Sequence, residues 1–321
     1  MTTQEISFTQ VVEIGCGIDV HKDLIVATIR KSNNDYETRE FSSVTSSLKS
    51  LRDWCKKEGA THVAMESTGV YWKPVFNVLE ESLEIILVNA RHVKNVPGHK
   101  TDKKDSRWLS KLLLSGLLKG SFIPPVDIRE LRDLVRYKRK VVAQMSSEKN
   151  RIIKVLEDAN IKLSSVLSNV DGAVGTKIIN SIIGGETDIE ELMKFYHGKI
   201  KTSRNDFRLA LEGRISNHHR FMLQLHRDSI SDKERIIERI EAEIEQATKA
   251  YQVEIDLLQT IPGVGKDSAI GIISEIGVDM SRFPDETHLS SWAGMSPGNN
   301  ESGGKKKSQG QFMAINTFKA H

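Results

Sequence analysis

Cysteine is scarce in this 321-residue sequence, and neither a signal peptide nor a membrane-spanning segment is recognisable. Only Cys16 and Cys55 are present, and Cys16 lies in an apolar strand pattern, so a disulfide framework and a cysteine-rich zinc site are excluded. No apolar run is long enough to span a bilayer, and the first residues lack the basic and apolar parts of a signal peptide. We therefore expect a cytoplasmic protein that has no contact with a membrane.

A large excess of charge of one sign is also missing, since the formal net charge is only +3. The charge is unevenly placed, however, because residues 91–151 hold 16 Lys and Arg against 6 Asp and Glu. A local cationic excess of this kind favours binding to a polyanion such as a nucleic acid. The length is sufficient for about two domains, each with its own core.

The N-terminal third has the pattern of an α/β domain. Two β-branched segments, 11–20 and 24–30, are separated by three residues and predict a hairpin. Helical and strand patterns then alternate, which predicts βαβ units and a largely parallel part of a sheet. These further elements are helix 44–58, strand 61–66, helix 71–81 and strand 84–88.

After Pro124 and Pro125 the pattern becomes helical. Residues 127–160 and roughly 204–250 have the pattern of long charged helices, and isoleucines recur at helical spacing near the end of the second. We expect a helical coiled-coil arm, for which an intramolecular helix pair and a dimer contact fit the pattern equally well. A mainly α C-terminal domain with a helix at about 266–276 follows. The expected domains are 1–123, 124–253 and 254–321.

Four acidic residues carry the strongest chemical signal. Asp19 and Glu66 each lie at the end of an apolar strand, where a buried carboxylate is costly unless a partner neutralises its charge. Asp102 and Asp105 lie one turn apart on one face of a helix that is expected to begin at Asp102, with Thr101 as its cap. Carboxylates from separate elements can hold divalent metal ions for phosphoryl transfer, and Mg²⁺ (or Mn²⁺) prefers such oxygen ligands.

These acids also have simpler interpretations. Asp102 and Asp105 are favoured at a helix N-terminus whatever the function, and Asp19 and Glu66 could lie in surface turns. The order of the four along the chain nevertheless matches the layout of a ribonuclease H-like fold and favours a metal site.

Gly15 and Gly17 have a competing interpretation as a phosphate-binding loop, and a Gly-Ile-Asp strand also occurs in actin-like kinases. These glycines precede the acid inside the strand pattern, and no third glycine opens a helix. His21 and Lys22 also stand where such a turn would need small residues. The phosphate-loop signal is therefore weak.

A glycine-containing turn near the C-terminus predicts contact with phosphate. Gly263 and Gly265 precede a helix that begins at Lys266, so successive backbone N–H groups can hold a nucleic-acid backbone without reading its sequence. The segment resembles a helix-hairpin-helix motif, and an ordinary helical corner is the alternative.

A second segment of interest contains Ser302, which lies beside two glycines and is followed by Lys305 and Lys306. Such a serine has an approachable hydroxyl, and the nearby positive charge suits a phosphodiester. A flexible basic loop is the alternative, because no general base is close to Ser302 in the sequence.

Five motifs occur along the chain in one order: Gly17-Ile18-Asp19-Val20-His21-Lys22, Glu66-Ser67-Thr68-Gly69-Val70-Tyr71-Trp72, Lys100-Thr101-Asp102-Lys103-Lys104-Asp105, Ile261-Pro262-Gly263-Val264-Gly265 and Ser302-Gly303-Gly304-Lys305. Together they resemble the DEDD transposases of bacterial insertion sequences, a family that includes the pilin-gene invertase and the bridge-RNA-guided recombinases. The resemblance covers nearly the whole chain.

The resemblance implies an α/β ribonuclease H-like N-terminal domain similar to the Holliday-junction resolvase RuvC. It implies that Asp19, Glu66, Asp102 and Asp105 are ligands of Mg²⁺ or Mn²⁺, and that Ser302 is the nucleophile that becomes covalently linked to DNA. It also implies that each active site combines two protomers, and hence a homodimer or a higher oligomer. DNA is the implied partner, with a non-coding guide RNA in at least part of the family, and the protein would act at the nucleoid.

The predicted function is therefore an insertion-sequence transposase or recombinase. The alternatives are a resolvase-type nuclease that uses water and a non-catalytic nucleic-acid-binding remnant. Family members usually continue beyond the serine motif with a helical, basic segment, whereas this sequence ends at His321, as expected of a truncated or frameshifted copy. The residues assigned to nucleic-acid contact are Gly263, Gly265, Lys266, Lys103, Lys104, Lys305 and Lys306.

Overall fold

The computed structural model describes residues 12–67, 69–89, 105–118, 120–283 and 285–293, and the backbone of 301–302 and 305–306. The chain forms two compact units, residues 1–123 and 124–321. The proposed further division at residue 254 stays a prediction. Within the described ranges, no helix is long and apolar enough to cross a membrane.

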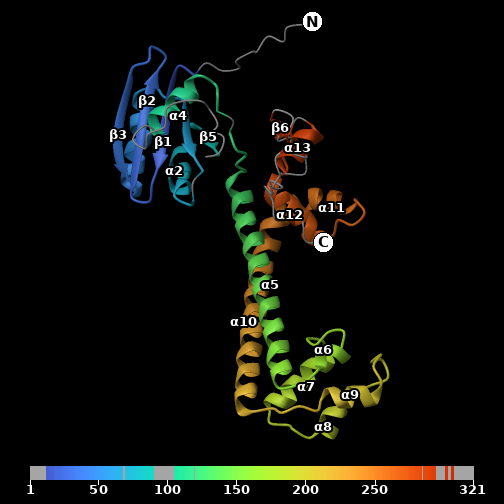
Figure 1. Cartoon of the computed structure of the whole chain (residues 1–321). Helices are drawn as coiled ribbons and strands as arrows, with labels where there is room; N and C mark the ends of the chain where they lie inside the picture. Colours follow the sequence, from blue (N-terminus) through green and yellow to red (C-terminus); the bar gives the residue numbers. More distant parts are fainter. Residues whose placement is uncertain are drawn as a thin grey trace. The chain divides into compact units, whose positions relative to one another are not determined.

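The first unit is an α/β domain built on a five-stranded sheet (Figure 1). The hairpin and the alternating helices and strands that the sequence predicted are confirmed. Its elements are β1 (Ile14–Val20), β2 (Leu24–Lys31), β3 (Tyr36–Ser42), α1 (Thr45–Lys57), β4 (His62–Glu66), α2 (Trp72–Leu79), β5 (Glu84–Val88) and α4 (Asp105–Leu114).

The sheet has the order β3-β2-β1-β4-β5. β1, β2 and β3 pair antiparallel, while β4 and β5 continue the sheet parallel to β1. This mixed arrangement fits the predicted ribonuclease H-like fold. β3 was not predicted, because it is a mostly exposed edge strand without alternating apolar residues.

The two faces of the sheet are covered by different helices. Cys16, Ile18 and Val20 of β1 belong to the main core, to which α1 and α2 also contribute buried side chains. Successive residues of a strand point to opposite faces, so Gly15, Gly17 and Asp19 belong to the other face. That second face is the one on which α4 packs (Figure 1).

Both cysteines lie in the main core as free thiols. A hydrogen bond with Cys55, together with burial, raises the pKa of the Cys16 thiol. The two thiols therefore act as small packing residues between β1 and α1.

In its described residues, the second unit consists of helices and one short hairpin. Its elements are α5 (Val126–Asp158), α6 (Leu163–Val166), α7 (Ala173–Ile183), α8 (Ile189–Met193), α9 (Arg204–Ala210), α10 (Asn217–Thr248), η2 (Lys249–Tyr251), α11 (Gln252–Gln259), α12 (Lys266–Ile276), η3 (Met280–Arg282), α13 (Glu286–Trp292), β6 (Glu301–Ser302) and β7 (Lys305–Lys306).

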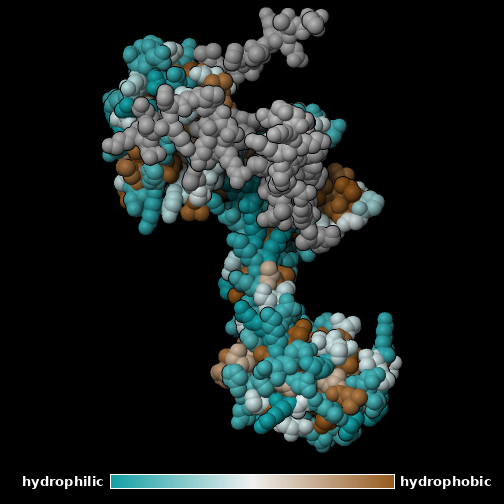
Figure 2. Space-filling model, viewed as in Figure 1, coloured by the Kyte–Doolittle hydropathy of each residue, from teal (hydrophilic) through white to brown (hydrophobic). Residues whose placement is uncertain are grey.

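The long helices α5 and α10 run antiparallel, side by side (Figure 1). Lys138 of α5 lies 2.8 Å from Glu241 of α10, and Asp158, twenty residues further along α5, lies 2.9 Å from His219. The residue numbers of the partners fall along α10 as they rise along α5, which defines the antiparallel direction. The visible surface of this pair is mostly hydrophilic (Figure 2), as expected when the apolar stripe of each helix faces the other.

One helix prediction was wrong. The pattern over 204–250 indicated one continuous helix, but α9 ends at Ala210 and α10 begins at Asn217. Ser216 caps α10 in a reciprocal capping box with His219. In between, the amide of Arg214 donates to the carbonyl of Ala159 at 2.8 Å, so this segment returns beside the end of α5.

A lobe of short helices, α6 to α9, connects the C-terminal end of α5 to the N-terminal end of α10 (Figure 1). Its core includes Phe207 and Leu163, both fully buried, and continues onto Ile152 and Leu156 of α5. α7 of this lobe buries Ile178, Ile179 and Ile182. The lobe therefore packs directly on the end of α5.

A buried ion cluster attaches α12 to α5. Glu275 is 1% exposed, and Arg136 donates to both of its carboxylate oxygens at 2.9 and 2.7 Å. Arg132 donates to the backbone carbonyls of Ser274 and Glu275 at 2.9 and 2.7 Å, and burial lowers its pKa. The last turn of α12 is thus held to α5 by charge-assisted hydrogen bonds.

Replacing Arg136 tests this attachment. In Arg136→Ala, the negative charge of the buried Glu275 loses part of its neutralising partners. The free energy of unfolding should therefore fall by up to about 3 kcal/mol. This is the low end for breaking a buried ion pair, because Arg136 itself is half exposed. Urea unfolding measures the change. The control is Arg235→Ala, which removes an exposed pair with Asp232 and should cost less than about 1 kcal/mol. Equal losses in both variants would contradict a special role for the Glu275 cluster.

Candidate active site

Asp19 and Glu66 lie on neighbouring parallel strands at matching positions. In the register between β1 and β4, Gly17 pairs with Ala64 and Ile18 pairs with Met65. Asp19 and Glu66 are the next residues of the two strands and stand one step beyond the last pair. Neighbouring strands are about 4.8 Å apart, and residues at matching positions point to the same face. The register therefore places these two acidic residues side by side on one face of the sheet.

The shared face is the one that α4 covers. Ala64 of β4 and Val88 of β5 form a small cluster with Leu109 and Leu113 of α4. Glu66 follows Ala64 by two residues, so it belongs to the same face. Asp19 likewise follows Gly17 by two residues.

Two glycines of β1 make room for α4. A Cβ added at Gly17 would lie 2.2 Å from the carbonyl oxygen of Ser106 and 2.3 Å from the amide nitrogen of Ser110. At Gly15 it would lie 2.7 Å from the Leu113 side chain. Only a residue without a side chain allows the backbone of α4 to come this close to the strand. We call Gly15 and Gly17 the glycine seat of α4, because they allow the helix to pack closely on β1. This packing is a structural reason for the glycine pattern that resembled a phosphate-binding loop.

The direction of α4 brings its first turn to the acidic end of β1. Gly15 lies against Leu113 and Gly17 lies against Ser106, so residue numbers in α4 fall as those in β1 rise. Two residues of a strand span about 6.6 Å, which corresponds to roughly four residues of helix. Asp19 is two residues beyond Gly17, and the helix begins at Asp105. Asp105 therefore belongs to the same end of this sheet face as Asp19 and Glu66.

Other predicted residues of this site fall outside the described part of the chain. These are Asp102, Lys103 and Lys104, together with the expected cap Thr101. Among the residues that the structure describes, no group of three His, Cys, Asp or Glu side chains is arranged to hold a metal ion. His21, which follows β1, places its Nε2 3.0 Å from Oδ2 of Asp19.

Ser302 lies in a short antiparallel hairpin of the second unit. β6 and β7 pair with the register Ser302 to Lys305 and Glu301 to Lys306. The register position of Ser302 is therefore directly opposite Lys305. The predicted nucleophile and two predicted phosphate-binding lysines thus belong to one small backbone element.

The turn between α11 and α12 has the backbone that its glycines predict. Gly263 has φ of +87°, a conformation that favours glycine, and Gly265 is the residue before the first turn of α12. No atom lies within 4 Å of a Cβ added at either glycine. Lys266 is also exposed. This turn is open to solvent within the described part of the unit.

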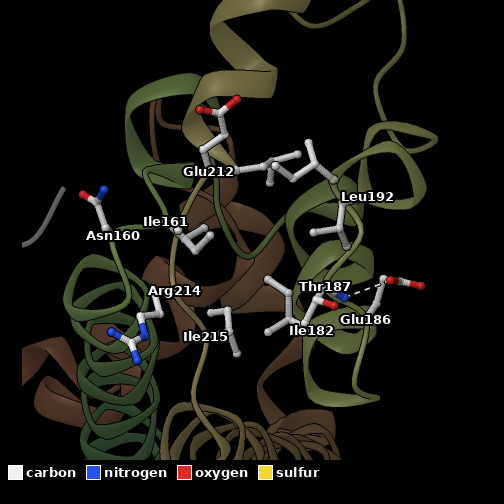
Figure 3. Close-up of a pocket in the computed structure, with 12 residues that line it drawn as sticks. Asn160, Ile161, Ile182, Glu186, Thr187, Leu192, Glu212, Arg214 and Ile215 are labelled. Atoms are coloured by element: carbon white, nitrogen blue, oxygen red, sulfur yellow. Dashed lines mark hydrogen bonds between the residues drawn. The ribbon is translucent and has the colours of Figure 1, made fainter.

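The second unit contains a cavity of about 410 Å³ in the lobe that connects α5 to α10. Its centre is apolar: the side chains of Ile161, Ile182 and Ile215 point toward one another, whereas Glu212 and Arg214 point away (Figure 3). None of the predicted catalytic residues is among those that line it. An apolar centre does not suit a hard cation such as Mg²⁺.

Sequence reasoning missed the groups that hold α4 in place. Thr28 of β2 and Ser106 of α4 share a hydrogen bond at 2.8 Å, and Arg30 donates to Ser110 at 3.2 Å. The signal that could have revealed the seat was the spacing of Gly15, Gly17 and Asp19, which all belong to one face of β1. The partners on α4 are about ninety residues away and had no local signature.

Comparison with known families identifies the class of protein. A family model described as "Transposase", of the DEDD IS110 type, matches residues 16–161, and a second, described as "Transposase IS116/IS110/IS902 family", matches residues 255–315. No curated protein sequence matches the chain. The fold and the two matches define the protein as a transposase. It belongs to the DEDD transposases of bacterial insertion sequences, in the IS110 family.

The glycine seat is tested by adding a single methyl group. Gly17→Ala forces the methyl against the backbone of α4, so we expect a loss of about 1–3 kcal/mol in the free energy of unfolding, as for other overpacked sites. The matched control is Gly120→Ala, where the added Cβ meets only Ile86 at an ordinary 3.4 Å. Thermal unfolding of both variants measures the difference. A Gly17→Ala protein as stable as the control would show that α4 does not pack on this strand.

Proposed function

We propose that this transposase breaks and rejoins DNA with a cluster of four carboxylates and a serine nucleophile. In this proposal Asp19, Glu66, Asp102 and Asp105 hold Mg²⁺ or Mn²⁺, and Ser302 attacks the DNA. Transposases act on DNA, and DEDD transposases typically use divalent metal ions, which supports the general class. The observation that carries the proposal is the matching position of Asp19 and Glu66 on the sheet face that α4 covers.

The donor set suits a hard divalent cation. Asp19 and Glu66 have matching positions on adjacent strands, and Asp105 is in the first turn of α4, so the proposed oxygen ligands would come from three elements. Asp102 precedes Asp105 by three residues, the spacing of one helical turn. A bound Mg²⁺ would supply Lewis-acid stabilisation of the charge that develops on the phosphate oxygens. The carboxylates would hold the cation that attracts the DNA phosphate.

Each stage of the serine reaction replaces one phosphorus–oxygen ester bond with another. The Oγ of Ser302 forms a bond to phosphorus, the bond from phosphorus to one deoxyribose oxygen breaks, and that oxygen takes up a proton while the serine loses one. Rejoining is the reverse with a new DNA hydroxyl as the attacking group. Lys305, which pairs with Ser302 in the hairpin register, has the charge to bind the phosphate.

We assign sequence-independent DNA contact to the turn before α12. The open backbone at Gly263 and Gly265 and the exposed Lys266 suit a phosphate group, in the manner of a helix-hairpin-helix element. Lys306, Lys103 and Lys104 are proposed to add further phosphate contacts. Such binding depends strongly on salt concentration.

A guide RNA is the proposed second nucleic-acid partner, and the basic region 91–151 is its proposed contact surface. Part of that charge is used within the chain, since Arg136 pairs with Glu275, and Lys138 pairs with Glu241 and Asp267. The cations beyond these internal pairs include Arg139 and Lys140, both exposed on α5. We propose that RNA contacts use these residues.

The antiparallel helices α5 and α10 are proposed to be a coiled-coil arm that also serves oligomerisation. Their apolar residues meet inside the unit, which supports the intramolecular pair as one part of this role. Among the described residues of α10, Phe221 and Leu225 are exposed one turn apart. A second protomer is the proposed partner for that surface.

Trapping a covalent intermediate tests the central step. The purified chain is incubated with Mg²⁺ and a plasmid that carries its own gene with the flanking DNA, and is then denatured in SDS. We expect a protein–DNA adduct that Ser302→Ala abolishes and that the matched control Ser308→Ala retains. Asp19→Asn should slow its formation by about 100-fold or more, because the charge stabilisation at the phosphate is lost.

Two other outcomes would replace the proposal. Undiminished DNA cleavage by Ser302→Ala would indicate a resolvase-type nuclease that uses water. DNA binding by the wild type without cleavage at any Mg²⁺ or Mn²⁺ concentration would indicate a non-catalytic remnant.

A further inference from the structure

We propose that Thr28 and Ser106 are positioning residues that fix α4 along the sheet and thereby hold Asp105 in place against Asp19 and Glu66. This inference rests on the proposed metal site of the first unit. It concerns side chains that neither bind the metal ion nor touch DNA, but determine where one of the carboxylates stands.

The residues under α4 form a row across the sheet. Thr38, Thr28 and Gly17 occupy matching positions on β3, β2 and β1, and the row continues to Ala64 of β4. All four are small, which lets α4 approach closely. Close approach sets the distance between helix and sheet, but a smooth apolar surface would let the helix slide along its axis or rotate.

Directional hydrogen bonds remove that freedom. Thr28 is fully buried and Ser106 is 2% exposed, and their hydroxyl oxygens lie 2.8 Å apart. The Oγ1 of Thr28 also lies 3.0 Å from the Oγ1 of Thr38. Breaking the bond would take from the buried Ser106 hydroxyl the partner that Thr28 provides, which costs about 1–3 kcal/mol. The position of Ser106 over Thr28 is therefore strongly preferred.

A second anchor lies one turn further along the same face of α4. The side chain of Ser110 is fully buried, accepts a hydrogen bond from Arg30 at 3.2 Å and donates to the carbonyl of Arg107 at 2.8 Å. Residues 106 and 110 have i, i+4 spacing and so face the sheet together. Two attachments on one helix face fix both its rotation and its position along the axis.

The anchor at Ser106 adjoins the proposed metal ligand directly. Asp105 is the first residue of α4, and Ser106 is the next. A slip of one residue would move the helix by about 1.5 Å and turn it by about 100°. Carboxylate ligands of Mg²⁺ tolerate only small departures from their preferred geometry. The hydrogen bonds of Thr28 and Ser106 thus act on metal affinity through Asp105.

The test compares two replacements of Thr28. Thr28→Val keeps the shape and the strand preference but removes the hydroxyl, whereas Thr28→Ser keeps the hydroxyl. Calorimetric titration of the full chain with Mg²⁺ should show binding weakened about tenfold in Thr28→Val, the low end for the loss of a group that orients a metal ligand. Thr28→Ser should restore binding to near the wild-type value.

Ser106→Ala provides an independent second variant and should weaken Mg²⁺ binding by a similar factor. Its control is Ser115→Ala, because the hydroxyl of the exposed Ser115 donates to the carbonyl of Lys111 within α4's own last turn. Thermal unfolding without Mg²⁺ is measured for each protein. Lower stability with unchanged Mg²⁺ binding in both Thr28→Val and Ser106→Ala would overturn the positioning role.

The same titration separates this inference from the proposed function. A wild-type chain that binds Mg²⁺, with binding lost in Asp19→Asn, supports the metal site whatever the Thr28 variants show. A wild-type chain that binds neither Mg²⁺ nor Mn²⁺ overturns the metal site, and the positioning role with it.

Discussion

The close packing of α4 on the glycines of β1 is the constraint on which the rest of the first unit depends. A side chain at Gly17 would overlap the backbone of α4 at Ser106 and Ser110, so the helix can lie this close only because that residue is glycine. Because α4 runs opposite to β1, its first turn comes to the end of the strand where Asp19 stands. The sheet register brings Glu66 beside Asp19. The steric condition at Gly17 and the register of β1 with β4 together place Asp19, Glu66 and the first turn of α4 at one end of one sheet face.

The chemistry of the proposed reaction is divided between the two units of the chain. The first unit offers carboxylates on a rigid sheet, which is suited to holding a metal ion in a fixed geometry. The second unit carries Ser302 in a small hairpin, and the helix α12 that precedes it is attached to α5 through the buried Glu275. Family membership assigns both parts to a transposase, since one family model matches residues 16–161 and another matches 255–315. The serine and the acids thus belong to different units of the chain.

Much of the first unit could be predicted from the sequence, because its strands and helices have clear local patterns. The hairpin, α1, β4, α2 and β5 follow from alternation and helical periodicity. β3 could not be predicted because its residues are mostly polar and exposed at the sheet edge. The interruption before α10 was missed because it contains no proline: α9 ends at Ala210, and Ser216 then starts α10 as its N-cap. For the candidate site, Asp19 and Glu66 were visible as acids at strand ends. Their common face and the polar anchors under α4 depend on contacts between residues far apart in the sequence, which no local pattern encodes.

The most direct test of the account is to locate a metal ion in the protein itself. Crystals of the full chain soaked in Mn²⁺ would be measured at a wavelength where manganese scatters anomalously. The account predicts an anomalous peak between the carboxylates of Asp19 and Glu66, at the first turn of α4 beside Asp105, and no such peak in Asp19→Asn crystals. A peak only at other sites, or none in the wild type at saturating Mn²⁺, would contradict it.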